Sequence, residues 1–277
     1  MKAIVVTDPG TPEVLNYTDV PTPAVKPGWS RIKVMGFGIN RSEIFTREGK
    51  SPSVQFPRIL GIEAVGIIDE TTDPERLPIG HKVISIMGEM GRAFDGSYAE
   101  YTLLPNEQIY PITTELSWPD LAAVPETFYT AFGIFKSLQI QATDKILVRA
   151  ATSGVGIAVL KLIKGLSTDI QVTGTTRSDT KRQALLDSGY DDVIITPDAN
   201  LLPDNVGSFD KIADLIGPSA TRDSLKHLNE FGILSATGEL GGVWTLNDFD
   251  PIFDIPNNRY LTCLLYTSDA ADELDGV

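Results

Sequence analysis

The stretch KILVRAATSGVG, from Lys145 to Gly156, decides the fold class of this chain. An apolar segment that is typical of a buried strand leads into a turn of small residues, and a helical pattern then starts at Val155. Small residues at such a turn let backbone N–H groups approach a pyrophosphate at the positive end of the helix. The stretch predicts either a nucleotide-binding turn or an ordinary connection between a strand and a helix.

The glycine pattern of this turn matches the dinucleotide-binding fingerprint only in part. Ala151 and Ser153 stand where two of its three glycines would be, whereas Gly156 fits the third position. If the turn binds a dinucleotide, the candidate contacts are Thr152, Ser153, Gly154, Val155 and Gly156.

Strands and helices alternate around this stretch, after a helix predicted over Leu121–Leu138. The predicted strands are Ile146–Arg149, Gln171–Thr175, Asp192–Ile195, Phe209–Leu215 and Gly232–Ala236. The predicted helices are Val155–Leu166, Thr180–Asp187 and Ala220–Leu228. Strict alternation with crossovers of this length predicts a doubly wound parallel sheet.

The N-terminal part of the chain has a different pattern, in which short β-like runs are separated by Pro and Gly. These runs are Ala3–Val6, Arg31–Gly36, Ala64–Asp69, Lys82–Ile86 and Tyr98–Leu103. We therefore predict an α/β protein with a β-rich domain over residues 1–122 and a Rossmann domain over residues 123–265.

The end of the second Rossmann strand indicates which dinucleotide would bind. Enzymes that prefer NAD usually place Asp or Glu there, but this chain has Thr176, Arg177 and Ser178, followed by Lys181. The two cations could flank a 2′-phosphate, with a hydroxyl of Thr176 or Ser178 donating a hydrogen bond. This pattern favours NADP(H). The alternative is that Lys181 and its neighbour Arg182 are solvated charges on a helix.

Composition excludes several classes of function. The 277 residues include 23 Lys and Arg against 37 Asp and Glu, and the net charge of −14 argues against nucleic acid or an anionic membrane as a partner. Cys263 is the single cysteine, and His81 and His227 are the two histidines, so a disulfide framework and a cysteine-rich zinc site are excluded. The N-terminus reaches a turn at Asp8 before a signal-peptide core could form, so we expect a cytoplasmic location.

Several segments in a fixed order carry a resemblance to a known family. They are Met1–Ala3 with Pro12–Leu15, Gly38–Glu43, Arg47–Gly49, Pro57–Gly66, Gly96–Tyr101, Tyr129–Phe132, Ala150–Gly156, and Gly232 to Gly238 with Gly241 and Gly242. Through them the chain resembles the medium-chain dehydrogenase/reductase superfamily, and within it the zinc-free quinone oxidoreductase-like branch. The resemblance implies that the β-rich domain is GroES-like.

The resemblance also implies that no metal takes part. The zinc enzymes of the superfamily have Cys where this chain has Asn40 and His where it has Ile62, and neither side chain can anchor zinc. Glu63 remains from that pattern, and we interpret it as a structural ion-pair or hydrogen-bond partner.

For the reaction, the resemblance implies hydride transfer from NADPH to a quinone, enone or similar small-molecule acceptor. Asn40 would donate a hydrogen bond to the acceptor oxygen, Thr130 would lie near the nicotinamide, and the backbone near Gly238 would contact the cofactor. Phe45 stands where many quinone reductases have tyrosine, so water could deliver the proton. Alternatively, Asn40 caps a turn and Thr130 bonds within its own helix.

The end of the chain departs from the family pattern. Residues 260–262 would open a further Rossmann strand, but residues 266–277 match nothing in the pattern. We hypothesise a truncated chain that lacks the family's C-terminal return segment, which would compromise the homodimer that the resemblance implies. The alternatives to an active enzyme are an NADPH-binding sensor or scaffold without turnover, and an inactive truncated fragment.

Overall fold

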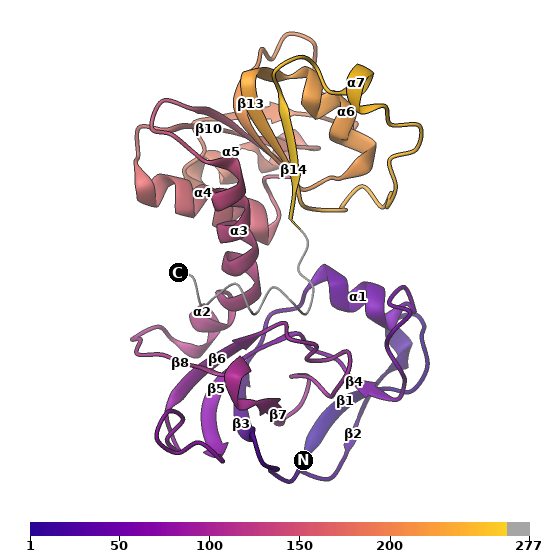
Figure 1. Cartoon of the computed structure of the whole chain (residues 1–277), viewed down its shortest axis with the longest axis vertical. Helices are drawn as coiled ribbons and strands as arrows, with labels where there is room; N and C mark the ends of the chain where they lie inside the picture. The colour runs from indigo at the N-terminus through magenta and orange to yellow at the C-terminus, as the bar shows by residue number, and fades with distance from the viewer. Residues whose placement is uncertain (265–277) are drawn as a thin grey trace. The chain divides into compact units, whose positions relative to one another are not determined.

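The structure is a computed structural model that describes residues 1–264, and residues 265–277, which include the tail over residues 266–277, lie outside the described part. The described residues form two compact units, Met1–Glu126 and a second unit that begins at Thr127. Figure 1 shows both units, with most of their helices and strands labelled.

The first unit contains two antiparallel sheets. The larger one has the strand order β7-β3-β5-β6-β8, and the smaller one has the order β2-β1-β4. The strand bounds are β1 Lys2–Val6, β2 Leu15–Asp19, β3 Trp29–Gly36, β4 Arg58–Ile59, β5 Glu63–Glu70, β6 Lys82–Ile86, β7 Tyr101–Pro105 and β8 Tyr110–Pro111. The helical elements are the 3-10 turns η1 Pro12–Val14 and η2 Asn106–Gln108 and the helices α1 Arg41–Arg47 and α2 Trp118–Ala122.

One predicted strand of this unit is wrong at its beginning. The prediction started at Tyr98, but β7 starts at Tyr101 and pairs with β3 from there. The backbone of Tyr98 is bonded elsewhere, because its N–H donates to the carbonyl of Leu60 at 2.9 Å and its carbonyl accepts from Ile4 at 2.8 Å. The Tyr98 ring stacks on Phe37 with 4.8 Å between centroids. Contacts with distant segments thus take Tyr98 out of the β7 ladder.

The second unit is built on one parallel six-stranded sheet with the order β11-β10-β9-β12-β13-β14. Its strands are β9 Lys145–Arg149, β10 Gln171–Thr176, β11 Asp192–Ile195, β12 Phe209–Asp214, β13 Leu228–Ala236 and β14 Tyr260–Cys263. Its helical elements are α3 Pro125–Leu138, whose first two residues belong to the first unit, α4 Gly154–Leu166, η3 Asp179–Lys181, α5 Arg182–Ser188, α6 Pro218–Lys226 and α7 Pro251–Asp254. The α/β fold class and the predicted strand at Tyr260 are confirmed.

The sheet buries a different core on each face, as the alternation of side chains along a strand requires. In β9, Ile146 and Val148 pack in the same cluster as Val159 of α4. Leu147, between them, packs with Leu225 of α6. Figure 1 shows α4 and α6 on opposite faces of the sheet. Continuous apolar strands in this unit therefore reflect burial on both faces.

Three predicted helices differ from the structure. The predicted helix over Ala220–Leu228 is α6 Pro218–Lys226, and Leu228 is the first residue of β13. The predicted helix over Leu121–Leu138 is two helices, because α2 ends before Ala123 and α3 begins at Pro125, which lacks the N–H that a continuous helix needs. The predicted helix over Thr180–Asp187 starts as the 3-10 turn η3 and becomes α-helical only at Arg182.

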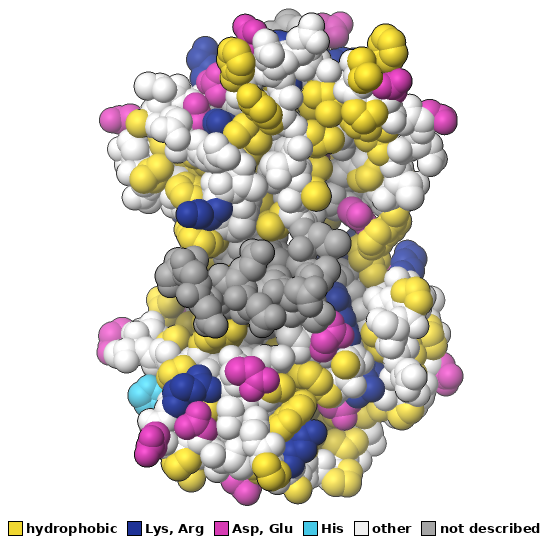
Figure 2. Space-filling model, viewed as in Figure 1, with side chains coloured by type: hydrophobic (Ala, Val, Ile, Leu, Met, Phe, Trp, Pro, Cys, Tyr) yellow, Lys and Arg dark blue, Asp and Glu magenta, His cyan; other side chains and the backbone are white. Residues whose placement is uncertain are grey.

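Residues 1–264 contain no helix that could span a bilayer. Figure 2 shows Lys and Arg side chains dispersed among Asp and Glu on the face that it draws.

Candidate functional site

The sheet order places a topological switch point at the carboxyl ends of β9 and β12. The chain passes from β9 to β10 on one side, whereas β12 lies on the other side of β9. In open parallel sheets, ligands bind outside the carboxyl ends of the strands at such a point. The residues that follow β9, β10, β12 and β13 are therefore the candidate nucleotide-binding edge.

The turn after β9 presents unpaired backbone donors. Ser153 caps α4, because its hydroxyl accepts from the N–H of Gly156 at 3.0 Å. The N–H groups of Gly154 and Val155 have no hydrogen-bond partner among the described residues. Thr152 and Gly154 are exposed. A pyrophosphate fits this arrangement, since it needs N–H donors at a helix N-terminus and open approach.

Two glycines let strand and helix approach closely at this turn. A Cβ on Gly156 would lie 2.8 Å from the carbonyl oxygen of Ala151, and a Cβ on Gly174 of β10 would lie 2.7 Å from the Cβ of Ala151. Gly156 is buried, so the structure assigns it to helix packing, which is the role of the third fingerprint glycine. Sequence reasoning missed Gly174, whose signal was a glycine within a predicted strand.

After β10, some side chains have partners within the protein, whereas two exposed cations form no ion pair with the described residues. Thr176 is buried, and the Ser178 hydroxyl lies 2.8 Å from that of Thr180. Arg177 and Lys181 are exposed and form no ion pair within the described part of the chain. Arg182 differs, since its guanidinium donates to the carbonyl of Val193 at 2.8 Å and pairs with Asp192. Two cations therefore remain available for a phosphate at this strand end.

Gly238 lies after β13, and its backbone is hydrogen-bonded within the protein. Its N–H donates to the carbonyl of Asp214 at 3.2 Å, and a Cβ on it would lie 2.3 Å from the carbonyl oxygen of Leu215. Its own carbonyl lies close to Gly217, where an added Cβ would meet it at 2.4 Å. Only a residue without a side chain fits between these two loops.

In the first unit, Asn40 and Glu63 form a partly buried hydrogen-bonded pair. Asn40 precedes α1, and its Nδ2 donates to Oε1 of Glu63 at 2.7 Å. The other carboxylate oxygen of Glu63 accepts from the N–H of Glu126 at 3.0 Å. Gly38 also donates its N–H to Glu63, and a Cβ on Gly38 would overlap Oε1. The expected role of Glu63 as a hydrogen-bond partner agrees with these contacts.

The carboxylate of Glu43 accepts hydrogen bonds from the backbone of both Asn40 and Ile62. These are the two positions where zinc enzymes of the superfamily have metal ligands. Oε2 of Glu43 accepts from the N–H of Asn40 at 2.6 Å, and its Oε1 accepts from the N–H of Ile62 at 2.8 Å. The Tyr98 hydroxyl donates to the same Oε2 at 2.6 Å. Sequence reasoning missed Glu43, although a Glu three residues after a capping Asn is the signal of a capping box.

Burial raises the pKa of both carboxyl groups. Desolvation is the main cause for Glu43 and for Glu63, and the hydrogen bonds that each accepts act in the opposite direction. The charge of Glu63 raises the pKa of Glu43 further. Burial is also the main reason that the pKa of Tyr98 is raised. Within residues 1–264, no group of three His, Cys, Asp or Glu side chains is arranged to hold a metal ion.

Phe45 and Thr130 occupy different units. The ring of Phe45 in α1 lies 5.4 Å from the Arg41 guanidinium and 5.3 Å from the Lys50 ammonium, measured to its centroid. Thr130 lies half-buried in α3 of the second unit. Asn40 belongs to the first unit and Thr130 to the second, and their catalytic roles stay predictions.

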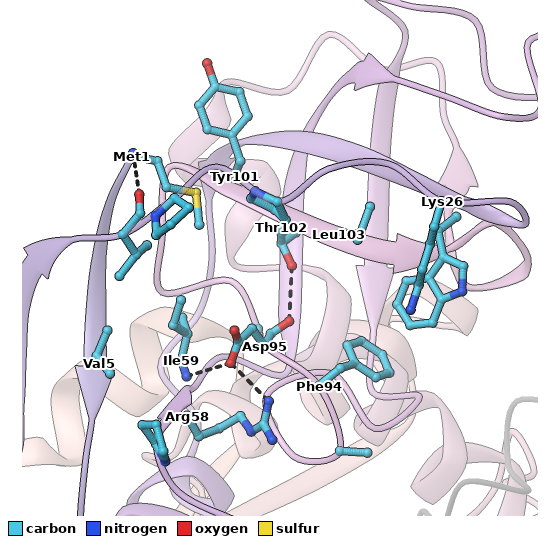
Figure 3. Close-up of a pocket in the computed structure, with 17 residues that line it drawn as sticks. Met1, Val5, Lys26, Arg58, Ile59, Phe94, Asp95, Tyr101, Thr102 and Leu103 are labelled. Carbon is cyan, nitrogen blue, oxygen red and sulfur yellow. Dashed lines mark hydrogen bonds and ion pairs between the residues drawn. The ribbon is translucent and has the colours of Figure 1, made fainter.

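A cavity of about 500 Å³ opens elsewhere in the first unit. Figure 3 shows Lys26, Phe94 and Tyr101 around it, with Asp95 bonded to Arg58. Its lining is mostly apolar and contains none of the predicted site residues. The candidate catalytic residues thus lie outside this cavity.

The comparisons with known proteins agree with this architecture. A family model described as the alcohol dehydrogenase GroES-like domain matches residues 26–114. The quinone oxidoreductase of Mus musculus is 30% identical to this chain over 251 residues, which make up 87% of this chain and 72% of the mouse protein.

Solved structures share the fold over nearly the whole chain. A structure of an NAD-dependent alcohol dehydrogenase has a TM-score of 0.84 at 24% identity, and the match covers 99% of this chain and 89% of that one. The quinone oxidoreductase of Coxiella burnetii has a TM-score of 0.82 at 25% identity, with coverage of 99% and 86%.

Proposed function

This chain is an oxidoreductase of the quinone oxidoreductase-like branch of the medium-chain dehydrogenase/reductase superfamily, and from that premise we propose that it reduces an electron-poor acceptor with NADPH and without zinc. Quinones, enones and similar compounds are the acceptor class. The name of the mouse relative supports this class.

The observation that carries the choice of NADPH is the charge at the end of β10. Arg177 and Lys181 are exposed cations without a carboxylate partner in the described residues, and no Asp or Glu occupies the strand end at Thr176 to Ser178. An enzyme that prefers NAD usually has a carboxylate there, which accepts from the ribose hydroxyls. A 2′-phosphate instead gains charge-assisted bonds from both cations.

The turn after β9 would bind the pyrophosphate. The N–H groups of Gly154 and Val155 would donate to its oxygens, and the positive end of α4 would favour its negative charge. When bound, NADPH supplies the hydride. The protein then has to bind the cofactor and the acceptor, orient them, and polarise the acceptor.

Asn40 would stabilise the charge that develops on the acceptor oxygen. Its Nδ2 carries two N–H groups, and one of them donates to Glu63. The second N–H would donate to the acceptor, where negative charge grows as the hydride arrives. Glu63 fixes the direction of the amide, so this donor needs little reorganisation.

Thr130 would contact the nicotinamide, and water would supply the proton. The ring of Phe45 has no exchangeable proton, and the Tyr98 hydroxyl already donates to Glu43. The side chains of Asn40 and Ile62 are not zinc ligands, which supports a reaction without that metal.

Steady-state assays with the full chain test this proposal. NADPH consumption is measured with a panel of quinones, enones, enoyl thioesters and aldehydes, and turnover with a quinone or enone is expected. Asn40→Ala should lower kcat by roughly tenfold to a hundredfold, because one preorganised donor is lost. Saturable NADPH binding without turnover on any acceptor would instead support the sensor or scaffold alternative.

A further inference from the structure

A buried pair of opposite charges lies at the topological switch point. Arg149 is the last residue of β9 and Asp214 is the last residue of β12, and the two face each other in the register of the sheet. Both side chains are completely buried. Burying charges is costly unless they are paired and bonded, so this pair needs an explanation at a ligand-binding edge.

Ser224 of α6 joins the two charges. Nη1 of Arg149 donates to the Ser224 hydroxyl at 2.8 Å, and this hydroxyl donates to Oδ2 of Asp214 at 3.0 Å. Nη1 also donates to Asp223 at 2.9 Å, and Nη2 donates to the carbonyl of Ala199 at 2.8 Å. The guanidinium is therefore fixed by bonds to α6 and to the segment after β11.

Asp214 binds the backbone of two loops at the same edge. Its Oδ1 accepts from the N–H groups of Ile216 at 2.9 Å and Gly217 at 3.2 Å, in the turn after β12. Its backbone carbonyl accepts from Thr237 at 3.0 Å and from Gly238, both after β13. Asp214 thus orders the turn that leads into α6 and the loop that contains the predicted cofactor contact.

Arg149 joins the network to the third loop, the one after β9. It directly precedes the turn of residues 150–153, which leads to the unpaired N–H groups of Gly154 and Val155 at the candidate pyrophosphate site. Burial raises the pKa of Asp214, and the Arg149 guanidinium acts against this shift. One bonded network therefore contacts or adjoins the loops after β9, β12 and β13.

We propose that Arg149, Ser224 and Asp214 are positioning residues that hold these three loops in the arrangement that binds the dinucleotide. The inference rests on the proposed function for the identity of the ligand. The network lies beneath the loops and is fully buried, so it acts through their backbone. It would therefore contribute equally to NADPH and NADH, unlike Arg177, which would distinguish them.

Ser224→Ala is the sharpest test, because it removes the bridging hydroxyl and leaves both charges with other partners. Ser85→Ala is the matched control, since Ser85 is a completely buried serine of the first unit whose hydroxyl donates to the carbonyl of Gln108 at 2.7 Å. Dissociation constants for NADPH and NADH are measured by calorimetry. Amide hydrogen exchange of residues 214–217 and 237–238 is measured without cofactor.

We expect Ser224→Ala to weaken both dinucleotides by the same factor, roughly tenfold, and to speed exchange in both segments. Ser85→Ala should change neither the affinities nor the exchange.

Arg149→Met serves as a second, stronger variant if it folds. Unchanged exchange in Ser224→Ala would overturn the network as a loop-positioning device. Faster exchange with unchanged affinity would overturn its role in binding. If the unaltered protein binds neither dinucleotide, the proposed function fails, and exchange alone decides whether the network orders the loops.

Discussion

The side-chain amide of Asn40 donates from Nδ2 to Oε1 of Glu63 at 2.7 Å. Glu63 is a buried carboxylate that accepts two further bonds, from the backbone N–H groups of Gly38 and Glu126. Each of the three groups that bond to this carboxylate donates a hydrogen bond. The ionised carboxylate is therefore the form of residue 63 that satisfies all of its neighbours.

Glu63→Gln should destabilise the first unit for this reason. The new amide places an N–H₂ group against N–H donors and leaves at least one buried donor without an acceptor, which costs about 1–3 kcal/mol. Urea unfolding measures the change. The control is Glu48→Gln, because Glu48 pairs with Lys50 at the surface, and little change is expected there. Equal stability of Glu63→Gln and the unaltered protein would contradict the prediction.

The raised pKa of Glu43 predicts a particular dependence of stability on pH. Because its folded pKa lies above the ordinary value of 4.5, the folded state binds more protons than the unfolded state between these two values. The free energy of unfolding should therefore decrease as the pH rises through that window.

Glu43→Gln should flatten this slope, which urea unfolding at a series of pH values from about 4 to 8 would show. Glu13→Gln is the control. The pKa of Glu13 is lowered by its bond to Thr11, so its effect should lie below pH 4.5. Parallel stability curves for Glu43→Gln and the unaltered protein would rule out this contribution of Glu43.

Arg177→Ala should weaken NADPH much more than NADH, if the guanidinium binds the 2′-phosphate. A charge-assisted bond contributes on the order of 1.5–3 kcal/mol, so the NADPH dissociation constant should rise roughly tenfold or more. Arg182→Ala is the matched control, because Arg182 is bonded to Val193 and Asp192. It should lower stability and leave the cofactor preference unchanged. An equal loss for both cofactors in Arg177→Ala would assign Arg177 to the fold or to the pyrophosphate.

Gly156→Ala and Gly165→Ala should change stability in opposite directions, although both lie in α4. The new Cβ at residue 156 would lie 2.8 Å from the Ala151 carbonyl oxygen, and such overpacking costs about 1–3 kcal/mol. At Gly165 the added atom meets nothing within 4 Å, and the gain in helix propensity is about 0.5–1 kcal/mol. Thermal unfolding compares the two, and a stable Gly156→Ala would show that α4 can shift away from β9.

Metal analysis of the purified full chain should find no stoichiometric zinc. The prediction follows from the amide of Asn40 and the alkyl side chain of Ile62, since neither supplies a zinc ligand. One tightly bound zinc per chain, lost together with activity, would overturn the zinc-independent reaction.

The sequence by itself determined the architecture of the second unit. Apolar strands alternating with helical patterns predict a parallel sheet, because hydrophobic periodicity is a local property that each segment carries. The predicted strand over Asp192–Ile195 has the bounds of β11. Local patterns also located the turn at Ala150 and the two cations after β10. The prediction failed at Pro125, where a local signal that divides the predicted helix was overlooked, and at Tyr98, where contacts with distant segments overrode the local pattern.

Only the tertiary structure decided which side chains meet. Arg149 and Ser224 are 75 residues apart in the chain, and Tyr98 and Glu43 are 55 apart, yet both pairs are hydrogen-bonded. No periodicity within a segment encodes such a contact, because it depends on how strands pair and helices pack after they form. For the same reason the sequence could propose Asn40 as a donor, but only the folded chain shows that Glu63 accepts one of its N–H groups.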